Sequence, residues 1–107
     1  MGDAFDQREE GFEKRFAMSE ALRFKALARR NKQLGLWAAA LLGHSGEAAE
    51  AYAEALVARQ VGRDDDALAA ELASQFAAAR VELSAHRLQR KMAETLAEAL
   101  ESVQAGR

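Results

Sequence analysis

Apolar residues in the first half of the chain recur at the spacing of one face of an α-helix. Between Ser19 and Leu42 they fall at positions 24, 27, 34, 38 and 41, and Gly43 follows as a helix stop. We therefore predict one long helix over residues 19–42.

Three further helices are predicted from N-cap residues and from apolar spacing. Ser45 can cap a second helix that ends near Gln60, the acidic run at 64–66 begins a third, and Ser84 caps a fourth. The connections are short, and short connections favour antiparallel neighbours. The predicted fold class is all-α: a small antiparallel four-helix bundle with a long first helix.

The inner faces of these helices supply a predicted core. Apolar side chains at i, i+3, i+4 and i+7 share one side of a helix and need a partner to bury them. The predicted core consists of Leu27, Leu34, Trp37, Leu41, Tyr52, Leu56, Leu72, Phe76, Leu88, Met92 and Leu96.

The first 18 residues extend the apolar stripe beyond the bundle. Phe5, Phe12 and Phe16 fall on nearly the same side of a continued helix as Leu27 and Leu34, yet they stand among charges. A helix over residues 3–42 would be about 60 Å long, against about 30 Å for the fourth helix, so the stripe lacks a partner on the chain. We predict a flexible N-terminal arm at 1–18 that orders on a partner, followed by a four-helix domain at 19–107. The alternative is an arm that folds back onto the bundle.

Composition narrows the functional class. The chain has no cysteine and no proline, which excludes disulfides and thiolate metal sites, and its abundant alanine favours helices. The longest apolar run, 34–42, is too short to span a bilayer, and the acidic N-terminus is unlike a signal peptide. We therefore expect a cytoplasmic protein without direct membrane insertion.

Charge is sorted along the chain, although its net value is only −2. Acids outnumber bases in residues 1–20, whereas residues 21–44 carry no acid and the bases Arg23, Lys25, Arg29, Arg30 and Lys32. A nucleic-acid-binding domain is usually basic overall, so no nucleic acid partner is expected. A solvated face or a protein contact are the two interpretations of Lys25, Arg29 and Lys32.

The residues that could form catalytic or metal-binding motifs do not have the spacing that those motifs require. The sequence GHSG at 43–46 is one residue short of a G-x-S-x-G nucleophile motif, and no strand precedes it. The acids at 64–66 fit a helix start, where carboxylates accept from free amides and meet the positive end of the helix dipole. His44 and His86 lack metal-ligand spacing. We expect no enzyme activity, no catalytic residue and no metal site.

The start of the fourth helix carries cations where the helix dipole disfavours them. Together with the exposed amides of the first turn, these cations form a candidate contact for an anion, or a weak ADP or ATP site, made by Ser84, His86, Arg87, Arg90 and Lys91. The alternative is a solvated basic face.

Three stretches of the sequence resemble a known family. They are FDQREEGFEKRFA at 5–17, FKALARRNKQLGLWAAALLG at 24–43 and EAYAEALV at 50–57. In them the chain is similar to the ζ subunit of alphaproteobacterial F-type ATP synthases, an ATPase inhibitor family once described as a domain of unknown function. The likeness extends over essentially the whole chain and is strongest up to Leu42.

The resemblance implies a partner for the arm. In this family a mobile N-terminal arm on a four-helix protein inserts at a catalytic α/β interface of the soluble head of the ATP synthase, reaches toward the rotor γ subunit and blocks ATP hydrolysis. Gly11 departs from the family's pattern and lowers the helix propensity of the arm. The implied partner-binding residues are Phe5, Arg8, Glu9, Phe12, Glu13 and Phe16.

Two functional hypotheses remain. The first is an inhibitory subunit of F-type ATP synthase, peripheral to the membrane-bound enzyme. The alternative is a nucleotide- or phosphate-sensing helical regulatory domain that uses the cations of the fourth helix. Truncation of the arm distinguishes them, because it removes inhibition under the first hypothesis and leaves anion binding intact under the second.

Overall fold

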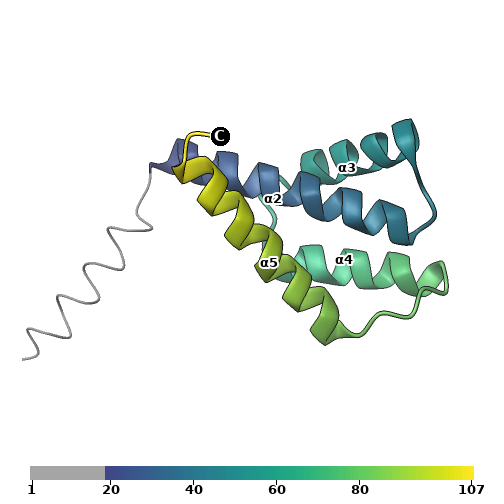
Figure 1. Ribbon diagram of the computed structural model, residues 1–107. Coiled ribbons are helices and arrows are strands. Elements are labelled where there is room, and N and C mark those ends of the chain that lie inside the picture. The colour runs from purple at the N-terminus through teal and green to yellow at the C-terminus, as the bar shows by residue number, and fades with distance from the viewer. Residues whose placement is uncertain (1–18) are drawn as a thin grey trace, which may run out of the picture.

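The computed structural model describes residues 19–107 of the 107-residue chain. The described part contains four helices and no strand: α2 (Glu20–Leu41), α3 (Gly46–Gln60), α4 (Asp65–Ala78) and α5 (Ala85–Gln104). Successive helices run in opposite directions, and α5 crosses α2 obliquely, so that its C-terminal end lies beside the start of α2 (Figure 1). The predicted all-α fold of four antiparallel helices is confirmed. The predicted arm at 1–18 lies outside the described residues.

N-cap residues set the helix starts. The side chains of Ser19, Asp64 and Ser84 each accept a hydrogen bond from the backbone N–H three residues further on, at 3.2, 2.9 and 3.1 Å. Ser45 has the extended N-cap backbone, but its side chain makes no capping hydrogen bond. The predicted helix starts are therefore confirmed, whereas the predicted side-chain cap at Ser45 is wrong.

Two glycines shape the hairpin of α2 and α3. Gly43 has a left-handed backbone, with φ +92°, and lets the His44 N–H donate to the carbonyl of Ala39 at 2.9 Å. Gly35 lies where the two helices touch, because a Cβ atom built there would come within 2.8 Å of the Ala53 Cα. The helices thus approach backbone to backbone.

The core draws on all four helices. Its buried cluster consists of Leu34, Ala38, Leu56, Leu68, Leu72, Phe76, Leu88 and Met92. Trp37 packs against the cluster and meets Phe76 edge to face, with ring centres 5.8 Å apart.

Most of the predicted core is buried. The prediction is confirmed for Leu34, Leu56, Leu72, Phe76, Leu88 and Met92, while Leu27, Trp37, Tyr52 and Leu96 are half-buried. Leu41 is 39% exposed, so its assignment to the core is wrong. The physical reason is its place at the end of α2, where the chain turns away from the other helices into the Gly43 loop.

Candidate functional site

The partner-binding residues implied by the family resemblance lie outside the described part of the chain. All six precede Ser19: Phe5, Arg8, Glu9, Phe12, Glu13 and Phe16. The structure does show where this segment joins the four helices. The junction is the capped start of α2, beside the C-terminal end of α5 (Figure 1).

Three of the five predicted anion-contact residues share a hollow at the start of α5. Arg87, Arg90 and Lys91 line it together with Glu94 and with Trp37 of α2, and its volume is about 290 Å³. Lys91 Nζ lies 5.9 Å from the centre of the Trp37 ring and 3.2 Å from Glu94 Oε1. The charge of Lys91 is therefore partly compensated within the protein.

The other two predicted residues of this site do not line the hollow. The Ser84 hydroxyl accepts from the Arg87 N–H as a helix cap, and the exposed His86 lies outside the hollow. Within residues 19–107 the side chains of Arg87 and Arg90 make no ion pair or hydrogen bond. These two guanidinium groups are the part of the predicted site that remains available to an anion.

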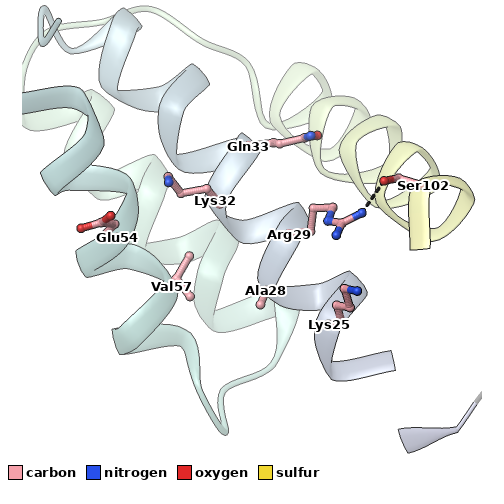
Figure 2. Close-up of a pocket in the computed structure, with 8 residues that line it drawn as sticks. All are labelled: Lys25, Ala28, Arg29, Lys32, Gln33, Glu54, Val57 and Ser102. Atoms are coloured by element: carbon pink, nitrogen blue, oxygen red, sulfur yellow. Dashed lines mark hydrogen bonds between the residues drawn. The ribbon is translucent and has the colours of Figure 1, made fainter. Parts of the chain in front are cut away.

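A larger groove of about 650 Å³ runs between α2, α3 and α5 (Figure 2). The Arg29 guanidinium donates to the Ser102 hydroxyl of α5, and Lys32 Nζ lies 3.0 Å from Glu50 Oε2 of α3. The hydrogen bond to Glu50 raises the pKa of Lys32. Two of the three cations on this face of α2 are thus held by the protein itself. Among the described residues Lys25 alone of the three has no such partner.

A third groove, of about 330 Å³, lies between α2, α3 and the turn that joins α3 to α4. Its large apolar residues are Phe24, Leu27, Val57 and Val61. We call it the Phe24 groove. Phe24 is 67% exposed and Val61 79% exposed, so both are large hydrophobic residues that nothing in the described part of the chain covers.

An ion pair between the buried Arg30 and the partly exposed Asp65 lies at the Phe24 groove. Arg30 is only 1% exposed, and its guanidinium donates to the two Asp65 carboxylate oxygens at 2.6 and 3.3 Å. Its Nε donates to Asn31 Oδ1 at 2.7 Å. The sequence analysis missed this pair, although the two polar residues at 30 and 31, in the middle of an apolar stripe, were a usable signal.

Gln60, another residue that lines this groove, carries a buried acceptor. Its Nε2 donates to the backbone carbonyls of Arg63 and Asp64 at 3.3 and 2.8 Å, which fixes the orientation of the amide. Its Oε1 is buried and has no hydrogen-bond partner among the described residues. An unsatisfied buried acceptor is uncommon and calls for an explanation.

Within 19–107 no group of three or more His, Asp or Glu side chains is placed to hold a metal ion. No helix in this range is long and apolar enough to cross a bilayer.

Comparison with known proteins identifies the family. No curated protein and no solved structure shows significant similarity to the chain. A family model described as ATPase inhibitor subunit zeta matches residues 1–102, which include the segment before α2 and nearly all of the four helices. The resemblance seen in three stretches of sequence is thereby confirmed, and the chain belongs to the ATPase inhibitor subunit zeta family.

Proposed function

We propose that this protein inhibits ATP hydrolysis by the F-type ATP synthase of its own organism, and that residues 1–18 carry the inhibition. The observation that supports this most directly is the family match, which begins at residue 1 and so includes the segment with Phe5, Phe12 and Phe16. The protein acts as a regulatory subunit without a reaction of its own. It binds the soluble head, made of α, β and γ subunits, at the cytoplasmic side of the membrane.

The inhibitory contact combines an apolar stripe with a charged rim. The three phenylalanines bury in a cleft at a catalytic α/β interface, while Arg8, Glu9 and Glu13 pair with polar groups at its edge. Such an interface has to open and close during each turnover. An arm that fits only one of its conformations stabilises that conformation and stops rotation without any chemistry.

The four-helix domain gives the arm a fixed origin. Ser19 caps α2, and Arg29 ties the third turn of α2 to Ser102 near the end of α5. The bound arm therefore continues from a helix whose position is set by tertiary contacts. This lowers the entropy that is lost when the arm orders.

ATP hydrolysis by the cognate enzyme tests the proposal. Deletion of residues 1–17 should abolish inhibition and leave the melting temperature nearly unchanged, because the four described helices bury a hydrophobic cluster among themselves. Phe12→Ala should weaken inhibition by about 2–4 kcal/mol as the loss of a central aromatic anchor. Lys14→Ala, off the apolar stripe, is the matched control and should have little effect. A truncated protein that still inhibits would place the function on the four-helix domain instead.

Gly11→Ala probes the conformation of the bound arm. If the arm is helical in the complex, alanine should strengthen inhibition by up to about 1 kcal/mol, since it lowers the cost of ordering the helix. Weaker inhibition by this variant would argue for a bend at Gly11.

A second candidate function rests on the hollow at the start of α5. Arg87 and Arg90 are free of partners within residues 19–107, so a phosphate group of ADP or ATP has two cations to bind. Nucleotide titration should then shift amide resonances around residues 84–91, and Arg87→Ala should abolish the shifts. The absence of shifts at millimolar nucleotide would remove this function and leave the inhibitory one untouched.

A further inference from the structure

We propose that the inhibitory interface extends beyond the arm onto the four-helix domain, where an apolar side chain of the ATP synthase head fills the Phe24 groove. This inference rests on the proposed function, because it assigns a second contact to the same partner. It makes the start of α2 and the α3–α4 turn part of the binding surface.

Exposure of apolar side chains singles out this groove. Four large hydrophobic residues in the described part of the chain are exposed: Leu22, Phe24, Leu41 and Val61. The two most exposed, Phe24 and Val61, line the same groove. Scattered exposed hydrophobic residues are ordinary, but a concave site with such residues on its walls is typical of a contact surface.

The position of the groove points to the partner. Phe24 lies five residues beyond the Ser19 cap, or about 8 Å along α2, so it is next to the point where the arm begins. No linker separates the two. When the arm is inserted in the enzyme, this turn of α2 must lie close to the enzyme surface.

Helical phase also indicates that the Phe24 groove contacts the same partner as the arm. If α2 continues into the arm on binding, at about 100° per residue, Leu27 falls on the side of Phe5, Phe12 and Phe16, and Phe24 falls on the adjoining side. The apolar stripe of the arm then runs on into the Phe24 groove. One partner surface can cover both.

The arm itself is a poorer occupant of the groove. To reach it, the chain would have to reverse between Phe16 and Ser19, and the residues in between are Ala17 and Met18. Neither is a turn former, and both favour a helix.

The surroundings define the chemistry of the occupant. Arg23 and Lys25 flank Phe24 in the sequence, are exposed and have no partner within residues 19–107. The groove therefore fits an apolar side chain with a carboxylate nearby. Ala28 and Val57, labelled in Figure 2, also line the neighbouring groove, so the contact can spread across α2.

The test uses full-length variants and the cognate ATPase head. Phe24→Ala should weaken binding by roughly 10- to 100-fold and Val61→Ala by less, as measured by surface binding and by inhibition of ATP hydrolysis. Both should melt like the parent, because both side chains are largely exposed. Leu41→Ala is the matched control: it truncates an exposed hydrophobic residue outside the groove and should bind like the parent.

Each remaining outcome overturns the inference in an identifiable way. If Phe12→Ala loses binding while Phe24→Ala and Val61→Ala bind like the parent, the groove contact is refuted and the inhibitory arm stands. If the parent protein does not bind the enzyme, both fall. Resonances of Phe24 and Val61 that move on deletion of residues 1–17 in the free protein would assign the groove to the arm. A dimer in sedimentation that Phe24→Ala dissociates would assign it to a second copy.

Discussion

The ion pair of Arg30 and Asp65 yields a sharp prediction about stability. The Arg30 side chain is 2% exposed, and its partner is the first residue of α4, next to Asp66. Asp65→Ala leaves a buried cation with Asn31 Oδ1 as its remaining side-chain acceptor in the described structure. Asp66→Ala removes a carboxylate from the same helix turn and leaves the pair intact, so it is the matched control.

The two variants should differ in the free energy of unfolding. Either carboxylate interacts with the dipole of α4 for about 0.3–1 kcal/mol, so Asp66→Ala should cost no more than about 1 kcal/mol. Removal of one partner from a fully buried pair costs about 3–5 kcal/mol. The Asp65 side chain is 56% exposed, and water screens the pair, so we expect about 2–3 kcal/mol for Asp65→Ala.

Thermal and urea denaturation measure this difference. For a domain of this size, a loss of 2–3 kcal/mol corresponds to a melting temperature lower by roughly 8–24 °C. In an Arg30→Met background, where the buried charge is gone, Asp65→Ala should cost no more than Asp66→Ala. Equal losses from the two variants in the parent background would refute the reasoning, because Arg30 would then not depend on Asp65.

Three other expectations concern packing and pH. Gly35→Ala should destabilise by about 1–3 kcal/mol in urea denaturation despite the better helix propensity of alanine, because its Cβ would lie 2.8 Å from the Ala53 Cα; a raised urea midpoint would contradict this. Leu34→Ala should cost about 2–5 kcal/mol in the same assay, since Leu34 is fully buried, and a parent-like midpoint would show that the inner face of α2 is misassigned. Burial alone would raise the pKa of Glu71, but hydrogen bonds from Arg59 and Arg63 outweigh it and hold that pKa below its usual value. The folded-state pKa is thus the lower one, and the ionised carboxylate stabilises the fold above the unfolded-state pKa and loses this effect as the pH falls through the folded-state pKa. Glu71→Gln should therefore melt lower than the parent at pH 7, with a difference that shrinks in acid; a constant difference would contradict the pairing.

Helix boundaries could be predicted because capping is a local interaction. Ser19, Asp64 and Ser84 each accept from an amide only three residues away, so the residues that fix the helix start are adjacent in the sequence. Ser45 shows the limit of that logic. The helix starts after it, yet no capping hydrogen bond forms there.

The core was predicted less completely. Apolar periodicity shows which side of a helix faces the core, but it does not show how far along the helix that side is buried. Phe24 and Leu41 fit the apolar stripe of α2, but they lie near its two ends and are exposed. Buried alanines such as Ala26 and Ala99 were missed for another reason. In a chain with alanine on every face of its helices, alanine carries no directional signal.

Tertiary contacts decide which cations on the basic face of α2 have a partner within the protein. Arg29 meets Ser102, which is 73 residues away in sequence, and Lys32 meets Glu50 on α3. No local pattern encodes these pairs, because they follow from how α3 and α5 pack against α2. Arg87, Arg90 and Lys91 could be grouped from the sequence, since they lie within five consecutive residues of one helix, and their binding of an anion stays a prediction.

The hydrophobic cluster and the Phe24 groove are held by different interactions. Substitutions in one of them can therefore change stability, and substitutions in the other can change binding. The cluster around Leu34, Phe76 and Met92 is apolar, whereas the Phe24 groove is lined by the paired Arg30 and Asp65 and by Gln60. Apolar burial stabilises the fold without a strict geometry, while a network of directed hydrogen bonds fixes one arrangement of side chains. A rigid groove next to the arm is what a second contact with the enzyme requires. Core substitutions should therefore lower the melting temperature and leave the affinity of the folded protein unchanged. Phe24→Ala should instead lower the affinity and leave the melting temperature unchanged.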